Sequence, residues 1–448
     1  MFVPPKPPIP SKPLALRGFL RAVRTNALSS WPVAAYDEPF IRRRFAGRTN
    51  LLLNAPDSIH RVLVDNPGNY RRSPASIRIL RPITGQGLLL SEGDAWKLQR
   101  RTIAPALAPR VMPLLARHIV TTTDAALGRL QHDQPLDLLA AMQNLTLDIA
   151  GRSMFSLEMH QYGADMRRLL TEFAEHHARP GMLDLVLPPS IPTPGDFGRW
   201  RFQKRWMGLI EAIMRERLHA ALPDTPRDLF DLLRAARDPE TGAGFTPDQL
   251  RDQVATLILA GHETTAVALF WAMSLLAQAP AEQHALAIET AAIDITPDDA
   301  MATMARLPRT RAVVNETLRL FPSAYLIVRE ALGTDNAGGV AIARRDLIMI
   351  APWVLHRHRG LWRDPDAFDP TRFLPDAPPP QRFSYLPFGA GPRVCVGAQF
   401  ALTEATIVLA AFVKRFEIAL DSTRPILPVG IVTTQPDHAP MFHLRRRG

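Results

Sequence analysis

The chain has 448 residues, of which 46% are hydrophobic and 21% charged, with a formal net charge of +10. This ordinary globular composition excludes a mostly disordered chain. The single cysteine excludes an internal disulfide framework and a four-cysteine iron–sulfur cluster. Positive charge can attract nucleic acid, an anionic membrane or an acidic protein, but the basic clusters are scattered, and we expect no nucleic-acid partner.

Up to about residue 284, the sequence predicts a small sheet followed by helices. Residues 1–13 are a proline-rich lead-in without the apolar core of a signal peptide. Short β-branched runs and turns between residues 33 and 90 predict strands. From residue 95 to about 284, apolar residues recur at i, i+3 and i+4, which predicts helices separated by proline-containing loops at 180–194 and 223–226.

The longest apolar stretch, at about 254–279, carries His262 and Glu263 near its middle. Because a charged side chain is costly in hydrocarbon, we expect a long buried helix and no transmembrane segment, in a soluble cytoplasmic protein. Further helices are predicted over 310–320 and 399–415, with short strands at 325–329 and 341–349 and a β-hairpin from residue 425. We therefore expect one domain over residues 1–448 that is mainly α with a minor β part.

The strongest chemical signal is the segment FGAGPRVCVG at 388–397, in which a glycine-rich turn precedes Cys395 and an apolar helix follows it. Such a turn directs backbone N–H groups to one point, and the helix adds the partial positive charge of its N-terminus. Both effects favour a thiolate and lower the pKa of the thiol. A thiolate held in this way suits axial ligation of haem iron, whereas a lone cysteine without such a turn is usually a buried structural residue.

A second cluster, AGHETT at 260–265, interrupts the long apolar stretch. Gly261 and the threonine pair are poor helix formers, and Glu263 is costly in an apolar interior unless it is paired or near water. Gly261 would let the helix open for a small ligand, Thr264 would hold water or dioxygen, and Glu263 would supply protons. The alternative is a kinked core helix whose threonine hydroxyls bond to its own backbone.

Two weaker motifs each have an ordinary alternative. Glu316 and Arg319, at i and i+3, share a helix face and can pair, and Arg372 offers a second guanidinium for Glu316. Trp96 and Arg100, at i and i+4, can grip a haem propionate together. In isolation, a solvent-exposed ion pair and an arginine stacked on an indole explain the same spacings.

Other familiar motifs are incomplete. There is no phosphate-binding loop of the GxxxxGK type, and the HETTA run at 262–266 lacks the second histidine of a zinc protease. Several histidines have no partner cluster, and we expect them on the surface rather than on a metal: His176, His177, His356 and His358.

Taken in order, these motifs resemble those of the cytochrome P-450 superfamily of haem-thiolate monooxygenases. The haem-binding loop pattern of that family, F-x-x-G-x-R-x-C-x-G, is met at every fixed position from Phe388 to Gly397. Its oxygen-binding pattern [AG]-G-x-[DE]-T-[TS] is met at 260–265, its E-x-x-R at 316–319, its P-x-R-F at 370–373 and its W-x-x-x-R at 96–100. The resemblance extends from about residue 50 to residue 447 and implies the fold of that family.

The resemblance also assigns roles to particular residues. It implies haem b, iron protoporphyrin IX, as the cofactor and Cys395 as the axial ligand of its iron. It implies that Glu263 and Thr264 form the catalytic acid–alcohol pair that delivers protons during the activation of dioxygen. Glu316, Arg319 and Arg372 would be structural. The remaining implied cofactor-binding residues are Trp96, Arg100, Gly261, Arg329, Phe388, Gly389 and Arg393.

The implied reaction inserts one atom of dioxygen into a small molecule, while the other leaves as water and two electrons come from outside. Fifty-three residues follow Cys395. Because this is too short for a flavin reductase, and no cysteines remain for a ferredoxin, we expect no fused reductase or ferredoxin domain. Electrons would come from a separate acidic ferredoxin or flavodoxin with its reductase, docking on basic residues such as Arg100, Arg101 and those near Arg393.

Two alternative functions stay open on the sequence. One is a peroxide-driven peroxygenase of the same fold, although such proteins generally lack the acid–alcohol pair that Glu263 and Thr264 supply. The other is a non-catalytic haem protein for sensing or electron transfer. An electron carrier would not need the interrupted helix, and a sensor would usually carry an attached output domain, which we do not expect here. A monomer is the expected oligomeric state.

By resemblance, the substrate pocket draws on residues near 69–90, 171–206, 256–264, 324–328 and 431–433. These segments are rich in leucine, isoleucine, valine and methionine, which predicts a lipophilic substrate such as a fatty acid, terpenoid or steroid-like molecule. A group of arginines either pairs with a substrate carboxylate or belongs to a solvated basic loop: Arg71, Arg72, Arg78 and Arg81.

Overall fold

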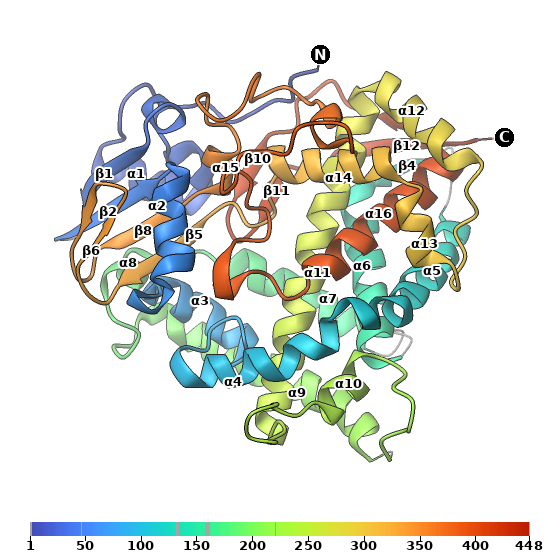
Figure 1. Ribbon diagram of the computed structural model, residues 1–448, viewed down its shortest axis with the longest axis horizontal. Coiled ribbons are helices and arrows are strands. Elements are labelled where there is room, and N and C mark those ends of the chain that lie inside the picture. The colour runs from blue at the N-terminus through green and yellow to red at the C-terminus, as the bar shows by residue number, and fades with distance from the viewer. Residues whose placement is uncertain (1, 46, 131–133, 157–161, 220, 448) are drawn as a thin grey trace.

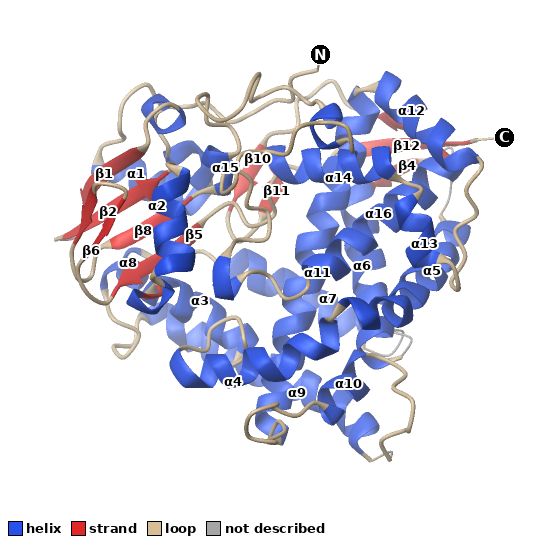
Figure 2. Ribbon diagram, viewed as in Figure 1, coloured by secondary structure: helices blue, strands red, loops and turns tan. Residues whose placement is uncertain are grey.

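The computed structural model describes residues 2–45, 47–130, 134–156, 162–219 and 221–447 (Figure 1). Helices fill most of the molecule and the largest sheet lies at one end of it (Figure 2), which confirms the expected mainly α architecture with a minor β part. The α-helices are α1 (Leu16–Thr25), α2 (Pro56–His60), α3 (Pro74–Thr84), α4 (Gly93–Ile103), α5 (Met112–Arg129), α6 (Leu138–Phe155), α7 (Gly163–Glu172), α8 (Met182–Val186), α9 (Pro194–Leu218), α10 (Leu229–Ala235), α11 (Pro247–Gln278), α12 (Pro280–Ala291), α13 (Ala300–Ala305), α14 (Pro308–Leu320), α15 (Pro352–Leu355) and α16 (Ala398–Arg415).

The five-stranded sheet has the order β1-β2-β8-β5-β3. β2 and β8 pair in parallel, and the other neighbours are antiparallel. The register of β3 and β5 places Arg72 opposite Arg329, so two arginines far apart in the chain face each other across one strand pair. The strands are β1 (Phe40–Phe45), β2 (Arg48–Leu53), β3 (Tyr70–Arg72), β5 (Ile327–Ala331) and β8 (Leu347–Ile350).

Three smaller sheets complete the β part. A three-stranded sheet has the order β4 (Pro135–Asp137), β12 (Met441–Arg446) and β9 (Phe416–Leu420). β6 (Asp335–Ala337) pairs with β7 (Val340–Ile342). β10 (Pro428–Gly430) pairs with β11 (Thr434–Pro436), and this pair is the hairpin that the sequence predicts after residue 425.

Helix α11 runs through the centre of the molecule and is the long buried helix that the sequence predicts (Figure 1). It begins at Pro247, earlier than the apolar stretch, because Thr246 and Gln249 form a capping box and proline suits the first helical position. Among the described residues, α11 alone is long and apolar enough to span a membrane, and 67% of its apolar window is buried inside the molecule. That degree of burial is typical of a core helix.

A buried ion pair fixes α14 to the loop that leads toward Cys395. Glu316 and Arg319 are both fully buried, and two guanidinium nitrogens donate to the carboxylate at 2.7 Å. The same guanidinium donates to three backbone carbonyls of the following loop, those of His356, Pro365 and Ala367, at 2.6–2.9 Å. Every donor of this charged group is therefore used, as burial of a charge requires. This burial excludes the alternative of a solvent-exposed pair and agrees with the structural role that the resemblance implies.

His356 connects this ion pair to the segment before Cys395. It is fully buried, its Nδ1 lies 3.2 Å from the Arg319 carbonyl, and the backbone N–H of Leu386 donates to its Nε2 at 2.8 Å. Because Nε2 accepts, the hydrogen must sit on Nδ1, and the neutral ring satisfies both neighbours. Burial, with the charge of Arg319, lowers the pKa of His356 to about 3. The expected surface location of His356 and His358 is therefore wrong, since both are buried.

We predict that Glu316→Ala lowers the free energy of unfolding by about 3–5 kcal/mol, because it leaves the Arg319 charge buried without its partner. Chemical denaturation measures this change. The matched control is Asp165→Ala, which removes an exposed ion pair to Arg168 with the same i, i+3 spacing and should cost at most about 1 kcal/mol. Equal losses in the two variants would contradict a special role for the buried pair.

His356 predicts a pH dependence of stability. Its pKa is about 3 in the folded chain, below the ordinary value of 6.5, so below pH 6.5 the unfolded chain binds a proton that the folded chain does not. The stability that the neutral ring confers is complete above pH 6.5 and falls as the pH drops toward 3, by up to about 4 kcal/mol. Unfolding free energies of wild type and His356→Gln should therefore converge in acid; parallel pH curves would exclude this role.

Candidate active site around Cys395

The turn before Cys395 is held by close backbone contacts. Gly389 and Gly391 adopt φ values of +72° and +70°, which favour glycine, and a Cβ on Gly391 would lie 1.9 Å from the carbonyl oxygen of Leu63. The backbone N–H of Cys395 donates to the Phe388 carbonyl at 2.9 Å, which closes the loop. Helix α16 then begins at Ala398. The backbone path thus requires glycine at positions 389 and 391.

The thiol of Cys395 is exposed, yet protein atoms surround it closely enough for burial to raise its pKa. A side chain on a concave wall of the protein is open to solvent on one side and closely surrounded on the others, so the two observations agree. The backbone N–H of Gly397 and the charge of Arg100 act in the opposite direction, but burial outweighs them. The expected lowering of the pKa by the turn and helix is therefore wrong for the protein alone. A bound metal ion reverses this balance, because a coordinating thiol loses its proton.

Helix α11 presents one accessible face. Leu257, Ala260, Gly261 and Thr264 lie at i, i+3, i+4 and i+7 and so share this face, and each is partly or fully exposed. The rest of this stretch packs into the core, where Thr265 and the residues after it are buried. A Cβ added to Gly261 would meet nothing within 4 Å, so open space adjoins this glycine. The face can therefore accept a ligand beside a core helix.

Glu263 and Thr264 do not contact each other. The Glu263 carboxylate accepts hydrogen bonds from Gln435 on β11 and, at 3.5 Å, from Gln143 on α6. The Thr264 hydroxyl donates to the Ala260 carbonyl at 2.6 Å, which is the self-satisfied arrangement that the sequence left as an alternative. The two residues thus occupy adjacent helix faces, with Thr264 on the accessible one.

Three arginines and one carboxylate gather beside the cysteine loop. Arg72 and Arg329 face each other across β3 and β5, and Arg393 comes from the cysteine loop itself. Arg393 pairs with Glu92, whose other oxygen accepts the backbone N–H of Arg72 at 2.9 Å. Burial and then the neighbouring guanidiniums lower the pKa of Arg72 to about 9 and that of Arg329 to about 10. The cluster therefore carries more positive charge than its one carboxylate neutralises.

The cluster fits an anionic cofactor. Like charges opposite each other on paired strands are destabilising, and the Nε atom of Arg72 is buried without a hydrogen-bond partner. An anion with carboxylate groups, such as a haem with its two propionates, would supply both the missing acceptor and the missing negative charge. Arg72 and Glu92 are residues that the sequence did not assign to the cofactor, because only the β3–β5 register brings Arg72 to Arg329.

Trp96 and Arg100 each contact the cysteine loop, by different routes, and their shared role toward a haem propionate stays a prediction. The guanidinium of Arg393 lies 4.5 Å from the ring centroid of Trp96, which is a cation–π contact. Arg100 instead donates to the carbonyl of Val394 at 2.9 Å, and its charge acts on Cys395. Helix α4 thus contacts the cysteine loop twice. Trp96 packs against the side chain of Arg393, and Arg100 binds the backbone at Val394.

The arginines proposed for a substrate carboxylate mostly have protein partners. Arg71 donates to Glu330 at 3.1 Å. Arg78 is buried, and its guanidinium lies 3.3 Å from Asp196. Arg72 belongs to the cluster described above. Arg71 and Arg81 are both exposed, which agrees with the solvated alternative for these two.

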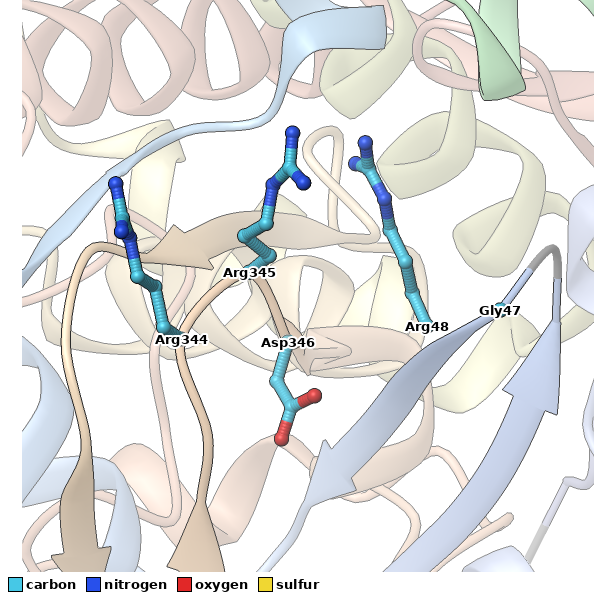
Figure 3. A pocket seen from close by; sticks show the side chains of 5 residues that line it. All are labelled: Gly47, Arg48, Arg344, Arg345 and Asp346. Atoms are coloured by element: carbon cyan, nitrogen blue, oxygen red, sulfur yellow. The ribbon is translucent and has the colours of Figure 1, made fainter.

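A cationic cleft of about 360 Å³ lies away from this site, where strands β2 and β8 of the five-stranded sheet begin (Figure 3). Arg48 from β2 and Arg344 and Arg345 from the turn before β8 line it, together with Gly47 and Asp346. None of these residues belongs to the cysteine loop, to α4 or to α11. The cleft is therefore separate from the candidate active site.

Comparisons with known proteins agree with the geometry. Residues 7–439 match the family model described as Cytochrome P450. Two relatives from Streptomyces melanosporofaciens are named cyclooctatin synthase, 34% identical, and cyclooctat-9-en-7-ol 5-monooxygenase, 30% identical; each alignment covers 81% of this chain and 79% of the relative. The structure of a cytochrome P450DA heme domain superposes with a TM-score of 0.84 over 99% of this chain and 98% of that one, at 24% identity. The chain belongs to the cytochrome P450 family and is an enzyme of that family.

Proposed function

We propose that this enzyme is a haem-thiolate monooxygenase that inserts one atom of dioxygen into a lipophilic small molecule, with electrons from a separate redox partner. The observation that carries the proposal is the placement of Cys395 on a closed glycine turn beside a cluster of arginines with excess positive charge. An axial ligand for the iron and cationic partners for the two propionates are the contacts that a haem-thiolate site must supply.

Within this proposal, each group at the site has one task. Cys395 would ligate the iron, and Arg72, Arg329 and Arg393 would hold the propionates. Bound haem supplies the activation of dioxygen, and the protein supplies orientation, protons and exclusion of water. Arg100 and the Gly397 N–H, which both act on the thiol, would stabilise the thiolate.

Protons would reach the accessible face of α11 through Thr264 and Glu263. Glu263 is partly exposed, and its carboxylate accepts from two neutral glutamine amides. Its side chain can therefore reorient without breaking a bond to a charged partner. The Thr264 hydroxyl can turn from the Ala260 carbonyl toward a ligand on the exposed face, at the cost of one local hydrogen bond.

The substrate class is supported by the relatives and by the site. The name cyclooctat-9-en-7-ol describes a mostly hydrocarbon alcohol as the substrate of one relative. Here Leu257 and Ala260 make the exposed face of α11 largely apolar, and Arg71 and Arg78 have protein partners. We therefore propose an apolar, terpenoid-like substrate without a carboxylate.

The electron donor would be a small acidic ferredoxin or flavodoxin with its reductase. Of the basic residues expected at its docking surface, Arg101 is already paired with Asp238 and Glu240, at 2.9 and 3.0 Å. Arg100 remains at the cysteine loop through its bond to Val394. We therefore propose that the docking surface lies at the cysteine loop and the neighbouring Arg100, rather than at Arg101.

The purified protein, reduced and exposed to carbon monoxide, should show the strongly red-shifted Soret band of a thiolate-ligated haem. In Cys395→Ser the haem should remain, held by the arginines, but the band should move to the position of a haem with a neutral ligand. Absorption spectroscopy measures both. Purified wild type that takes up no haem would disprove the proposed function.

The same spectra test the arginine cluster. Arg72→Met should lower haem content, because the propionates lose a buried donor. The matched control is Arg48→Met, which removes a half-buried arginine from the same sheet whose partner is Glu330. Equal haem content in Arg72→Met and wild type would show that Arg72 does not hold the cofactor.

Thr264→Ala should separate electron use from product formation. With a ferredoxin and its reductase under dioxygen, we expect product to fall at least roughly tenfold while reductant consumption continues, since proton delivery loses its hydroxyl. Thr265→Ala, a buried neighbour on the same helix, is the control. If hydrogen peroxide alone supports full turnover and the reductase supports none, the enzyme is a peroxygenase instead.

A further inference from the structure

The cationic cleft of Figure 3 brings three guanidinium groups together outside the candidate active site. Arg48, Arg344 and Arg345 line it, and in Figure 3 their side chains extend in the same direction. Its volume of about 360 Å³ lies within the range of sites that bind small molecules. The cleft therefore has room for a small anionic ligand.

The segments that form the cleft carry an excess of positive charge. Residues 40–48 and 340–346 contain six arginines and a single acidic residue, Asp346. The Asp346 carboxylate is buried and accepts the backbone N–H of Ala343 at 2.9 Å, and in Figure 3 it points away from the three guanidiniums. This carboxylate stabilises the turn and does not pair with the arginines.

A second carboxylate, on β5, is shared between two arginines. Glu330 accepts from Arg48 at 3.3 Å and from Arg71 at 3.1 Å. Arg344 and Arg345 are exposed, and their guanidiniums have no ion pair or hydrogen bond with any other residue that the structure describes. Within the described chain, the cleft therefore holds two cations without a counter-charge.

The backbone holds Arg345 in a conformation that favours glycine. Its φ is +73°, in a turn that the N–H of Asp346 closes on the Ala343 carbonyl at 3.1 Å. The N–H of Arg345 donates to the Ala331 carbonyl at 2.8 Å, which fastens this turn to the end of β5. A residue other than glycine costs free energy in this region, and such residues cluster at binding sites. The backbone path would suit glycine better, so the side chain explains the arginine.

Phosphate chemistry fits this arrangement better than a carboxylate does. A phosphate monoester carries about two negative charges at pH 7 and three strong acceptor oxygens. A carboxylate carries a single charge and matches a single guanidinium fork. Because arginine binds phosphate oxygens in a bidentate manner, several guanidiniums around one open cleft match a phosphoryl group.

We propose that this cleft binds a small soluble molecule through its phosphate or diphosphate group, at a site separate from the active site. Arg344 and Arg345 would contact the phosphate oxygens, and Arg48 would add a third guanidinium beside them. The turn is already fixed to β5, so little ordering is needed when the ligand binds. The inference rests on the cleft alone and goes beyond the proposed function.

The test is calorimetric titration of the full-length protein with inorganic pyrophosphate. We expect saturable binding that weakens in high salt, because exposed charges are screened. Malonate, which carries two carboxylates, should bind at least roughly tenfold more weakly. Absence of saturable binding up to about 1 mM pyrophosphate, or equal binding of malonate, would overturn the proposal.

Variants locate the contact. Arg344→Gln combined with Arg345→Gln should weaken pyrophosphate binding roughly tenfold or more, because two charge-assisted contacts are lost. The matched control is Arg445→Gln combined with Arg446→Gln, which removes two consecutive exposed arginines from β12 and should bind like wild type. Equal losses in the two double variants would indicate general charge attraction and would exclude a site at the cleft.

The turn conformation separates binding from stability. Arg345→Gly should weaken pyrophosphate binding yet raise the midpoint of thermal unfolding, because glycine adopts this φ without cost. Arg344→Gly, at a neighbouring position without a positive φ, should also weaken binding but lower the midpoint. A lower midpoint in Arg345→Gly would mean that the arginine serves stability, which would contradict the proposal.

Two further outcomes would assign the anion elsewhere. Loss of pyrophosphate binding in Arg72→Met, but not in the double glutamine variant of the cleft, would place the anion at the arginines beside Cys395. Binding of phosphatidic acid vesicles without binding of pyrophosphate would make the ligand a lipid headgroup. Either result would overturn the proposal. The haem spectrum of the cleft variants should match that of wild type, which separates this test from that of the proposed function.

Discussion

The ion pair between Glu316 and Arg319 is the constraint on which the position of the cysteine depends. Neither residue touches the cysteine loop. Arg319 instead binds three carbonyls of the loop after α15, and its own carbonyl meets His356, which receives the N–H of Leu386. Removal of either charge would leave the other buried, and removal of Arg319 would also release the three carbonyls. The position of the turn before Cys395 therefore depends on a pair of charges elsewhere in the chain.

Much of the site was predictable because its motifs are local. The glycine turn, the interrupted helix and the Glu–Arg spacing each lie within ten residues, and local backbone rules act on that scale. The predicted extents of α11, α14 and α16 agree with the structure to within a few residues, except at the start of α11, where a capping box extends the helix into polar sequence.

The remaining features depend on contacts between segments that are far apart in the sequence, and the spacing of residues within a motif does not reveal such contacts. The position of Arg72 beside Arg329 follows from strand register, and that of Arg393 over Trp96 from the packing of α4 on the cysteine loop. His356 was misassigned to the surface because its partners are backbone groups, which leave no trace in side-chain patterns. The sign of the Cys395 pKa shift was wrong for the same reason: burial is a tertiary property and it outweighs the local turn.

The charge balance of a buried cluster distinguishes arginines with a purely structural role from arginines that can bind an anionic ligand. Between α3, α8 and α9, Arg78 and Arg199 meet two aspartates, Asp184 and Asp196, and the charges of this group balance. Beside Cys395, Arg72, Arg329 and Arg393 share one carboxylate. Burial lowers the pKa of all three, and neighbouring guanidiniums lower those of Arg72 and Arg329 further. An anion from outside the chain would complete such an excess, so this imbalance supports the proposed propionate site independently of any motif.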